Sequence, residues 1–545
     1  MQTRELPIPE KLQPVLEGLP QALIVGGAVR DWLAGEVPKD LDIEVYQTKE
    51  EELKAHLGRF GKLDEVGKSF GVMKLTIENE TFDFSLPRQD SKAGSGHKDF
   101  KITYDPGMSP VEAAKRRDIT INAMGWNPAK RELIDPFGGQ EDLKRKIIRH
   151  TSSHFPEDPL RPLRCFQFAA RLGMEIAPET GSLCRTMASE GAFSMLPKER
   201  VAEEFIKFLL KGKDHRKGLT ALTTMGWSQF FPEIQALEGL EQDPEYHPEG
   251  DVLTHTAHCL SALGSIEGWK EMGDIKKVAL AFAVLCHDLG KASTTKREWK
   301  EKAGRVAVTS NGHDLAGMGP TRALAGRIGM ARGATEIACS LVVHHMAHLQ
   351  TRTDKDILKL AASLSPANPH SENCKVTTNI LELAVIVEAD HSGRPPLQKG
   401  LPEEMKKIVE NARRLGCLEK PQPPVLSGKR ILEQKIPLPE GKAMGEILKR
   451  AYAVQIQGEI KDTKTGLEWV RKNKRKILAE TKTGPEPLIN GKDLMAAGVA
   501  QGPDLTKLAA KAYDLQLEGK ISTKAEGLKA LRQDLAQNKE APPWM

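Results

Sequence analysis

The chain has 545 residues, of which 39% are hydrophobic and 28% are charged, and its formal net charge is +5. At about 100–200 residues per domain, this length predicts roughly three to five domains. The composition excludes disorder over most of the chain, and no segment approaches the roughly 18 consecutive apolar residues of a membrane-spanning helix. Seven scattered cysteines without a CxxC pair indicate reduced thiols and a cytoplasmic location.

The first predicted elements are strands around a glycine turn. Residues 21–46 predict a strand, a tight turn at Gly26-Gly27, a helix and a second strand. Four apolar stretches are expected to form strands, at 22–25, 41–46, 71–77 and 81–86. Beyond Pro159 the apolar spacing becomes helical, with few strand signals. The predicted fold class is therefore α+β, with a small mixed-sheet head followed by all-α regions.

Breaks that contain proline and glycine predict the domain boundaries. Such breaks close the head at 135–139, open a new helical region at 243–248 and end it at Pro395-Pro396. The predicted domains are a head at 1–150, a helical body at 151–242, a further helical domain at 243–400 and a helical tail at 401–545.

The tail contains an internal repeat and the chain's positive surplus. Gly428-Lys429 recurs as Gly491-Lys492 at an offset of 63, and Tyr452 recurs as Tyr513 at an offset of 61. Each copy is expected to form a turn and two or three short helices, so the pair indicates a duplicated binding module. Residues 401–545 hold 27 Lys+Arg against 19 Asp+Glu, which suits a polyanion as partner. A solvated helical surface is the alternative interpretation.

The segment "LIVGGAVRDWLAGEVPKDLDIEVY" carries the chemistry of the head. Gly26 and Gly27 follow a strand and precede a helix, where backbone N–H groups can approach a phosphate. Arg30 lies one helical turn later and could clamp the same triphosphate. Asp40 and Asp42 are spaced i and i+2, so a strand places them on one face.

Carboxylates in this arrangement favour a magnesium site. Mg²⁺ prefers hard oxygen ligands and keeps several waters while it binds substrate phosphates. Asp83, in the strand-like "TFDFSLPR", is placed to supply a third carboxylate. The predicted catalytic residues are Asp40, Asp42 and Asp83, and the predicted reaction is in-line displacement at phosphorus with two metals.

These residues resemble the head of the class II tRNA nucleotidyltransferases, or CCA-adding enzymes, of the polymerase-beta-like superfamily. The resemblance continues through "RRDITINAM" at 116–124, "DPFGGQEDL" at 135–143 and "EDPLRPLRCFQFAARLG" at 157–173. It covers residues 20–175 in the family's order. It implies that CTP and ATP are used, with release of pyrophosphate, to add or repair the CCA at the 3′ end of tRNA, and that the body and tail bind tRNA.

The resemblance also implies roles for individual residues. Asp158 and Arg161 would read the base as a protein template for C and A, because an arginine donates to a base edge and an aspartate accepts from an amino group. The nucleotide-binding set that it implies is Gly26, Gly27, Arg30, Arg117, Asp118, Asn122, Asp158, Arg161 and Arg164. Two positions depart from the family pattern: Pro162 stands where an aliphatic residue is usual, and Gln167 where an arginine is common.

Two segments of the head bear on which nucleotides are added. Residues 85–105 resemble the flexible loop that the family uses when it switches from C to A addition, which favours full CCA or A-only addition over CC addition. Lys68-Ser69 stands where a basic pair is expected in bacterial-type poly(A) polymerases. An A-adding enzyme and a poly(A) polymerase therefore remain as alternatives.

A second group of chemistry-bearing residues lies in the domain at 243–400. His287-Asp288 ends the apolar run "VALAFAVLC" and places an adjacent N,O ligand pair at the end of a buried helix. The predicted metal ligands are His255, His287, Asp288, His313, His345 and Asp390, with His345 preferred to its neighbour His344. This ligand mix suits a divalent transition metal such as Ni²⁺, Mn²⁺, Fe²⁺ or Co²⁺, with Zn²⁺ as a further alternative.

This stretch resembles the HD superfamily of metal-dependent phosphohydrolases. Some CCA-adding enzymes carry such a domain, which implies hydrolysis of 2′,3′-cyclic phosphates and phosphomonoesters here. Two other function classes compete with this interpretation. One is an RNA-binding protein with degenerate sites, and the other is a nucleotide phosphohydrolase in which the HD domain supplies the main activity.

Overall fold

A computed structural model describes residues 5–66, 72–92, 100–105, 107–301, 304–365, 378–434, 436, 441–481 and 486–537. Lys68-Ser69 and residues 93–99 of the predicted flexible loop lie outside the described residues. The chain forms two compact units. The first comprises Met1–His345 and Val385–Pro402, and the second comprises Met346–Ala384 and Glu403–Met545.

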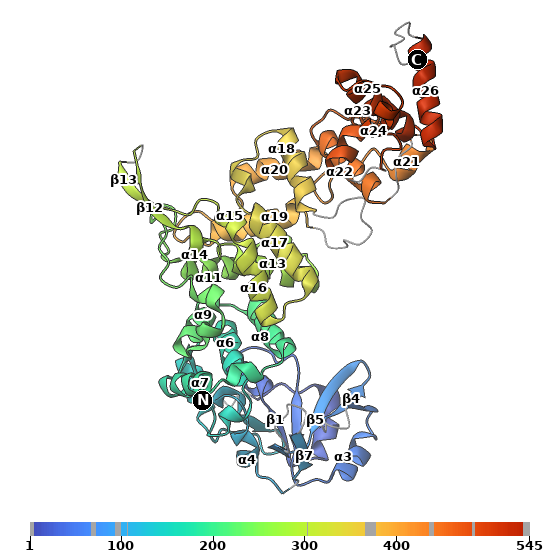
Figure 1. The fold of residues 1–545 in the computed structure, drawn as a ribbon. Helices are drawn as coiled ribbons and strands as arrows, with labels where there is room; N and C mark the ends of the chain where they lie inside the picture. The colour runs from blue at the N-terminus through green and yellow to red at the C-terminus, as the bar shows by residue number, and fades with distance from the viewer. Residues whose placement is uncertain are drawn as a thin grey trace. The chain divides into compact units, whose positions relative to one another are not determined.

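The head is built on a seven-stranded sheet with the order β3-β4-β5-β2-β1-β8-β9 (Figure 1). β2 and β5 are parallel, and the other neighbouring strands are antiparallel, so the sheet is mixed as predicted. The strands are β1 (Ala22–Val25), β2 (Asp42–Val45), β3 (Lys62–Val66), β4 (Val72–Ile77), β5 (Glu80–Ser85), β8 (Gly125–Asn127) and β9 (Glu132–Ile134). A separate hairpin pairs β6 (Arg88–Lys92) with β7 (Phe100–Tyr104).

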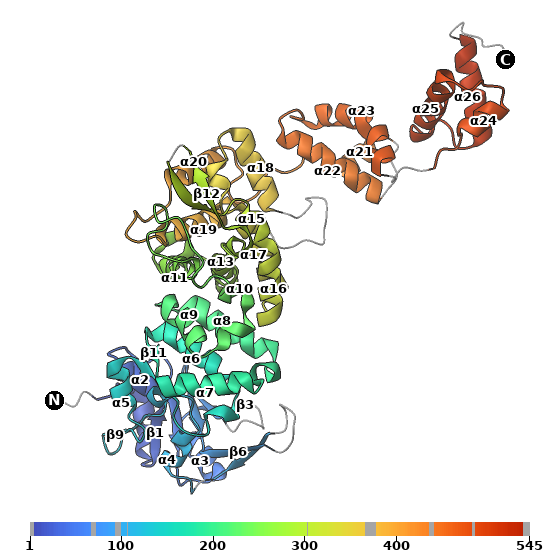
Figure 2. The same ribbon diagram turned by 60° about the vertical axis from the view of Figure 1, so that its left-hand side comes forward.

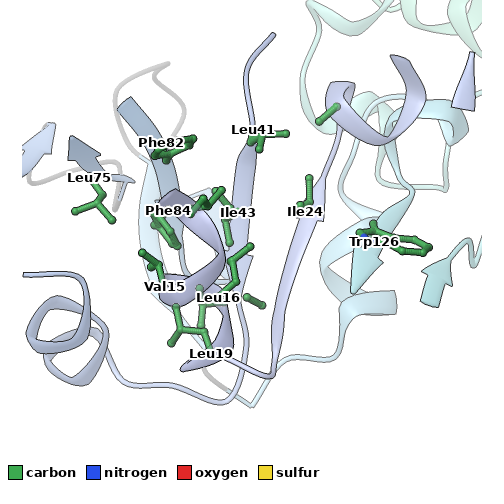
Figure 3. Packing of buried hydrophobic residues seen from close by; sticks show 14 of the residues in the cluster. Val15, Leu16, Leu19, Ile24, Leu41, Ile43, Leu75, Phe82, Phe84 and Trp126 are labelled. Atoms are coloured by element: carbon green, nitrogen blue, oxygen red, sulfur yellow. The ribbon is translucent and has the colours of Figure 1, made fainter. Parts of the chain in front are cut away.

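Short helices cover the sheet and close the head's core. They are η1 (Glu10–Leu12), α1 (Gln13–Glu17), α2 (Gly27–Leu33) and α3 (Glu50–Leu57). Figure 3 shows Leu16 and Leu19 against Ile43 and Phe84 of the central strands. Each such side chain contributes about 1.5–3 kcal/mol when it is fully buried. This core fixes β2 and β5, the strands that carry the predicted catalytic carboxylates.

The segments at 116–124 and 135–143 pack against each other at the end of the head. They contain η2 (Thr120–Asn122) and the start of α5 (Gly139–Arg145), after α4 (Pro110–Lys115). Gly139 allows the approach, because a Cβ there would lie 2.5 Å from the Thr120 carbonyl oxygen. Asp135 accepts hydrogen bonds from the backbone N–H of Gly139 and Gln140. The two motifs therefore form one structural support.

The body at 151–242 is helical around aromatic side chains. Phe166 of α6 stacks on Phe208 of α8, with ring centroids 4.3 Å apart. Pro162 lies in the first turn of α6, where a missing N–H is tolerated, and Gln167 is buried in the same helix. The elements are η3 (Phe155–Glu157), α6 (Arg161–Leu172), α7 (Pro178–Ser189), η4 (Ala192–Met195), α8 (Lys198–Lys211), α9 (His215–Thr224), η5 (Trp227–Phe230) and α10 (Pro232–Gln235), with β11 (Glu175–Ile176) paired to β10 (Ile147–Ile148).

The following region is helical around α13, whose residues 279–286 are all buried. One hairpin interrupts the helices, formed by β12 (Lys296–Lys300) and β13 (Arg305–Thr309) (Figure 1). The helices are α11 (Val252–Ala262), η6 (Leu263–Ser265), α12 (Glu267–Lys270), α13 (Asp274–Cys286), α14 (Lys291–Thr294), α15 (His313–Ala316), α16 (Met318–Ile328), α17 (Arg332–His344) and α19 (Ile380–Ser392).

In the second unit, each copy of the repeat forms three helices with a hydrophobic core (Figure 2). Gln455 accepts from the Val425 N–H and donates to the Pro423 carbonyl, and Gln516 makes the same pair of bonds to Leu488 and Glu486. The unit contains η7 (Ala347–Leu349), α18 (Asp354–Leu364), α20 (Glu403–Arg414), then α21 (Gly428–Glu433), α22 (Lys442–Ile456) and α23 (Thr463–Thr481), and finally α24 (Gly491–Ala496), α25 (Pro503–Leu517) and α26 (Lys524–Gln537). Within the described residues, no helix combines the length and apolar character that membrane crossing requires.

Candidate active sites

Two of the predicted catalytic carboxylates lie side by side on the head sheet. Asp42 and Asp83 are register partners in the parallel pair of β2 and β5. β2 begins at Asp42, so Asp40 lies in the connection just before the strand. Asp42 and Asp83 both line a cavity of about 320 Å³, together with Glu44 and Arg117. The sheet thus brings several carboxylates together on its interior strands.

The surroundings of Asp42 change its acidity. Partial enclosure by the cavity walls raises the pKa of Asp42, and the negative charge of Asp83 adds to the effect. Lys74 lies 3.7 Å from Asp83, and Arg117 lies 3.2 Å from Glu44. Negative charges held this close together favour a bound cation. Their hard oxygen donors fit Mg²⁺.

The glycine turn lies directly beside these carboxylates, because Val25 at the end of β1 is the register partner of Asp42. Gly26 has φ of +73°, a left-handed conformation that glycine adopts without steric cost. A Cβ on Gly26 would lie 3.3 Å from Nη1 of Arg117. Gly27 opens α2, as predicted from the order of strand, turn and helix. A side chain at Gly26 would therefore project between Arg117 and Asp42, and glycine keeps that space clear beside the carboxylates.

A buried polar network joins the predicted ribose-binding residues. Arg30 is 2% exposed and donates to Asn122 Oδ1 at 2.6 Å. Asn122 donates to Asp118 Oδ1 at 3.1 Å, and Arg164 donates to Asp118 Oδ2 at 2.8 Å. Burial opposes ionisation of Asp118, but the Arg164 charge and the hydrogen bonds from Asn122, Arg164 and the Ile119 N–H together outweigh it and hold the pKa of Asp118 below its usual range. Phe168 packs between the guanidinium groups of Arg30 and Arg164, 5.4 and 5.5 Å from its ring centroid.

The two predicted base-reading residues lie at the start of α6 but point to different partners. Asp158 pairs with Arg200 of α8 at 3.0 Å. Arg161 donates from both terminal nitrogens to backbone carbonyls, those of His154 and Arg116, at 2.6 Å each. Arg200 was missed by the sequence interpretation, because it lies 42 residues from its partner and outside every motif. The structure thus joins α6 and α8 in this part of the site.

The head cleft is a second cavity of about 840 Å³ that contains the whole predicted nucleotide-binding set. Nine lysine and arginine residues and six carboxylates line it. Lys39, Arg171, Lys211 and Lys213 belong to its wall and were also missed by the sequence interpretation. Asp42 and Arg117 line both this cleft and the smaller cavity. A cleft so rich in cations, next to a carboxylate pair, suits a polyphosphate substrate and its metal.

All six predicted ligands of the domain at 243–400 come together at the ends of helices, and we refer to them as the histidine centre. They are His255, His287, Asp288, His313, His345 and Asp390. Nε2 of His255 lies 3.4 Å from Nε2 of His287, and Nε2 of His313 lies 3.0 Å from Nε2 of His345. His255 Nε2 also lies 3.2 Å from Asp390 Oδ1, and His313 Nε2 lies 3.4 Å from Asp288 Oδ1.

The other ring nitrogen of each histidine has an acceptor, which fixes the direction of the ring. Nδ1 of His287, His313 and His345 lies 2.6–2.7 Å from a backbone carbonyl oxygen three residues earlier. Nδ1 of His255 lies 2.7 Å from Oε1 of Glu249. These acceptors orient each ring so that its Nε2 atom is directed inward. His344 instead places Nδ1 2.7 Å from the Ser340 carbonyl and takes no part in this convergence.

Two buried carboxylates and their neighbouring histidines determine the electrostatics of the histidine centre. Burial opposes ionisation of Asp288 and Asp390, but neighbouring histidines outweigh it and hold the pKa of each carboxyl well below its usual range. Lys291 lies 2.7 Å from Asp288. Burial, with the nearby His287, lowers the pKa of His345 to about 3, so this imidazole is neutral. At His287, by contrast, the Asp288 carboxylate and Cys259 together outweigh burial and raise the pKa to about 10, and the pKa of His255 is also raised, so a metal bound there would displace protons from these imidazoles.

Two further residues of this region were missed by the sequence interpretation. Glu249 bridges His247 and His255 through Oε1, at 2.9 and 2.7 Å. Cys259 lies in the same four-residue group of potential metal ligands as His255, His287 and Asp390. Its position four residues after His255 on α11 is a helical spacing that could have revealed it.

Comparisons with known proteins place this geometry in context. Residues 22–149 match the family model described as "Poly A polymerase head domain", and residues 173–237 match "Probable RNA and SrmB- binding site of polymerase A". The chain is 34% identical over 382 residues to the multifunctional CCA protein of Xylella fastidiosa (strain M23), an alignment that spans 69% of this chain and 84% of the relative. It is 36% identical over 345 residues to that of Neisseria gonorrhoeae (strain NCCP11945), with 62% and 78% covered.

Among solved structures, a CCA-adding enzyme in complex with CTP superimposes with a TM-score of 0.51 at 19% identity, covering 86% of this chain and 99% of the other. The apo form II of a CCA-adding enzyme gives 0.51 at 20% identity, with 85% and 96% covered. These two likenesses concern the fold.

Proposed function

The chain belongs to the family of multifunctional CCA proteins and is a nucleotidyltransferase, and from that premise we propose that its head adds or repairs the 3′-terminal CCA of tRNA from CTP and ATP. The observation that carries this proposal is the pairing of Asp42 with Asp83 beside the Gly26 turn. Carboxylates, a glycine turn beside them and a cation-lined cleft are the parts that nucleotidyl transfer to a 3′-hydroxyl requires.

Each part of the head has a role in this reaction. Asp40, Asp42 and Asp83 would hold Mg²⁺, which supplies Lewis-acid stabilisation of the reacting phosphate when it is bound. The backbone around Gly26 and Arg30 would hold the triphosphate. Asp118 would accept a hydrogen bond from the ribose 2′-hydroxyl, which favours ribonucleotides.

Base selection would take place at the start of α6. The Asp158 carboxylate can accept from the exocyclic amino group that cytosine and adenine share. Its present partner, Arg200, lies on α8 at 3.0 Å, so a bound base would exchange one hydrogen bond of Asp158 for another. Arg161 would turn from its two backbone carbonyls towards the base edge. A protein template of this kind needs no nucleic-acid template.

Incorporation of labelled CTP and ATP, each alone and together, into tRNA transcripts that end at the discriminator base, at C and at CC tests the proposal. We expect growth by C, C and A, followed by arrest. Addition of A only to the CC end would assign A-adding activity instead, and long A tails would assign a poly(A) polymerase. No incorporation on any acceptor would refute the nucleotidyl-transfer proposal.

We also propose that the histidine centre is a phosphohydrolase site for 2′,3′-cyclic phosphates and phosphomonoesters at RNA ends. The observation that supports this second activity is the inward convergence of four Nε2 atoms with Asp288 and Asp390. The centre would hold a divalent transition metal such as Ni²⁺, Mn²⁺ or Co²⁺, which supplies an activated water when it is bound. Release of phosphate from a 2′,3′-cyclic nucleotide with each metal in turn tests it, and no turnover with any metal would refute it.

The tail would bind the phosphate backbone of the tRNA. Arg471, Lys472, Arg475 and Lys476 on α23 are all exposed, and such contacts bind phosphate without reading sequence. Replacing Lys472 and Lys476 by glutamine should reduce the salt dependence of tRNA binding, because fewer counterions are released. An unchanged salt slope would exclude α23 from the interface.

The six described cysteines are free and buried, which supports a cytoplasmic setting for both activities.

A further inference from the structure

Two exposed aromatic residues lie on segments that lead to the histidine centre. Tyr246 is 58% exposed and Trp299 is 63% exposed, and within the described part of the chain no other Phe, Tyr or Trp is more than half exposed. Tyr246 lies in the connection that precedes α11. Trp299 lies on β12 of the hairpin, which extends beyond the neighbouring helices (Figure 1). Neither of the proposed activities assigns a role to these two side chains.

Ion pairs and hydrogen bonds join the hairpin to the connection that carries Tyr246. Arg305 of β13 donates to the two carboxylate oxygens of Asp243 at 2.8 and 2.9 Å, and to Glu245 Oε2 at 2.5 Å. The backbone N–H of Val308 donates to Asp243 as well, at 3.3 Å. Glu245 immediately precedes Tyr246 in the chain. The hairpin is therefore held against the segment on which Tyr246 lies.

Both segments continue directly to side chains of the histidine centre. Glu249 follows Tyr246 by three residues, and its Oε1 lies 2.7 Å from Nδ1 of His255. Ser310 follows the second strand of the hairpin, and its carbonyl oxygen lies 2.7 Å from Nδ1 of His313. The segments that present the two exposed aromatic rings therefore also orient two of the imidazoles proposed to bind metal.

The exposed face of the hairpin combines apolar side chains with a surplus of cations. Trp299 is the register partner of Val306, which is 56% exposed. Residues 296–309 contain five Lys or Arg against two Glu. Surfaces that bind single-stranded nucleic acid combine aromatic rings, on which bases stack, with cations that meet the phosphates. The core of a protein–protein interface is instead depleted of charged residues, so this composition favours a nucleic acid as the occupant.

We propose that Tyr246 and Trp299 form a stacking surface for unpaired nucleotides at the 3′ end of an RNA whose terminal phosphate is hydrolysed at the histidine centre. The inference rests on the proposed phosphohydrolase activity and names its substrate, an RNA strand of several nucleotides in place of a free nucleotide. Aromatic rings hold bases by stacking with little regard to sequence. The cations of the hairpin meet the phosphates, which positions the strand.

The length of the hairpin sets the length of RNA that can use this surface. The hydroxyl of Thr295 lies 2.8 Å from that of Ser310 at the base of the hairpin. Trp299 follows Thr295 by four residues, which span about 13 Å in a strand. Stacked nucleotides of one strand follow each other at about 3.4 Å, so about four unpaired nucleotides bridge this distance. A mononucleotide bound at the histidine centre is too short to contact Trp299.

The dependence of hydrolysis on RNA length tests this surface. The full chain, with the metal that supports turnover, is assayed on 2′,3′-cyclic AMP and on a single-stranded RNA of about eight nucleotides that ends in a 2′,3′-cyclic phosphate. We expect Trp299→Ala to lower the ratio of kcat/KM for the RNA to kcat/KM for the mononucleotide by about tenfold or more, because one stacked base is lost. Tyr246→Ala should lower the same ratio. An unchanged ratio in both variants would overturn the proposal.

Three further variants separate stacking from folding. Trp299→Phe keeps an aromatic ring and should hold the ratio within about threefold of the wild type, whereas Trp299→Leu is apolar without a ring and should lose it as alanine does. Ile275→Ala is the matched control, because Ile275 is 86% exposed at the start of α13 and lies outside both segments. Its ratio should not change. An equal fall in Ile275→Ala, or full retention in Trp299→Leu, would contradict stacking.

Fluorescence quenching gives a readout that needs neither metal nor turnover. The metal-free full chain is titrated with the same single-stranded RNA, and we expect the wild type to lose more tryptophan emission than Trp299→Phe. A duplex of the same length should quench the two proteins equally, because its bases are already stacked on one another. Equal quenching by the single strand would overturn the surface, and a protein partner on this face would give that result. Unequal quenching without hydrolysis of either substrate would refute the phosphohydrolase and retain the RNA surface.

Discussion

The head cleft and the histidine centre differ in solvent exposure and in the type of ligand that they offer to a cation. In the head, Asp40 and Asp42 are exposed to solvent, and the acidic side chains lie on or just before the paired strands β2 and β5. In the histidine centre, His255, His287 and Asp288 are at most 2% exposed and lie in or next to helix ends. The first site is open and rich in oxygen, and the second is enclosed and rich in nitrogen.

The difference follows from the ions that the two sites suit. Mg²⁺ gives up its waters reluctantly and is bound by a few carboxylates together with substrate phosphates. Mg²⁺ is therefore suited by a solvent-exposed site in which the protein supplies only some of the ligands. Borderline transition metals are held by imidazoles whose direction is fixed by a second hydrogen bond. The Nδ1 contacts of the four histidines fix the direction of the imidazole rings in this way.

The strongest test of this comparison separates the two sites. Asp42→Asn should lower nucleotide incorporation by about a thousandfold or more, because several kcal/mol of transition-state stabilisation are lost with the metal ligand. Asp288→Asn should leave incorporation unchanged and abolish hydrolysis of a 2′,3′-cyclic nucleotide. Both assays are run on both variants. If Asp288→Asn also stopped incorporation, the two sites would not be independent.

The next largest effect concerns the buried charge in the head network. Arg164→Met should lower the unfolding free energy of the body around α6 by about 3–5 kcal/mol, because it leaves the Asp118 carboxylate buried without its partner. Arg171→Met on the same helix, 3.9 Å from Asp31, is the matched control and should cost about 1 kcal/mol or less. Hydrogen exchange of the α6 amides in urea measures both.

The same variant carries a pH signature. The wild-type pKa of Asp118 is depressed, so its stabilising contribution is present above the unfolded value of about 4 and is lost as pH falls through the folded value. Arg164→Met removes that component, and its unfolding free energy should fall less steeply below about pH 4. Parallel acid losses in the two proteins would show that Arg164 does not hold Asp118 ionised.

A smaller effect distinguishes neighbouring histidines in the histidine centre. His345→Ala should lower hydrolysis or metal affinity by about 10–100-fold, since it removes an inward Nε2. His344→Ala, one residue earlier and bonded to the Ser340 carbonyl, should stay within about threefold. Metal content and phosphate release are measured on both variants. Equal losses would mean that the two imidazoles are not distinguished by direction.

The smallest of these effects lies at the glycine turn. Gly26→Ala forces an L-residue to φ of +73° at a cost of roughly 1–2 kcal/mol, and should raise KM for CTP about tenfold. Gly27→Ala has ordinary φ and a Cβ 3.4 Å from Arg30, and should change KM about twofold. Steady-state kinetics with saturating tRNA compares them. A larger effect at Gly27 would point to Arg30, and not to the backbone, as the sensitive element.

The sequence was most informative where one short segment carries both structure and chemistry. The strand at 22–25 and the glycine turn were predicted at their observed positions, because an apolar run followed by two glycines allows few conformations. β8 and β9 were not predicted, since three-residue strands are too short to show a period. The β12–β13 hairpin interrupts a stretch expected to be helical.

The missed site residues share one cause. Arg200 and Lys211 reach the head cleft from α8, and the residues of the head that line this cleft lie far away along the chain. A single sequence records spacing along the chain, and these contacts depend on how helices pack. His255 and Asp390 were predicted despite a separation of 135 residues because the stretch from 243 to 400 resembles the HD superfamily. Of their neighbours, Glu249 needed the fold, whereas the helical spacing of Cys259 from His255 could have revealed it.

The position of Asp390 along the chain determines when each site can form during synthesis. The predicted catalytic carboxylates of the head all precede Ser85, and its sheet is complete at Ile134. Asp390 emerges only after Met346–Ala384, a segment that belongs to the other compact unit. At about 5–20 residues per second, about 20–70 s of translation separate Asp42 from Asp390. A nascent chain halted after Ile134 has emerged and before Asp390 carries the complete head sheet and a histidine centre that still lacks its last carboxylate.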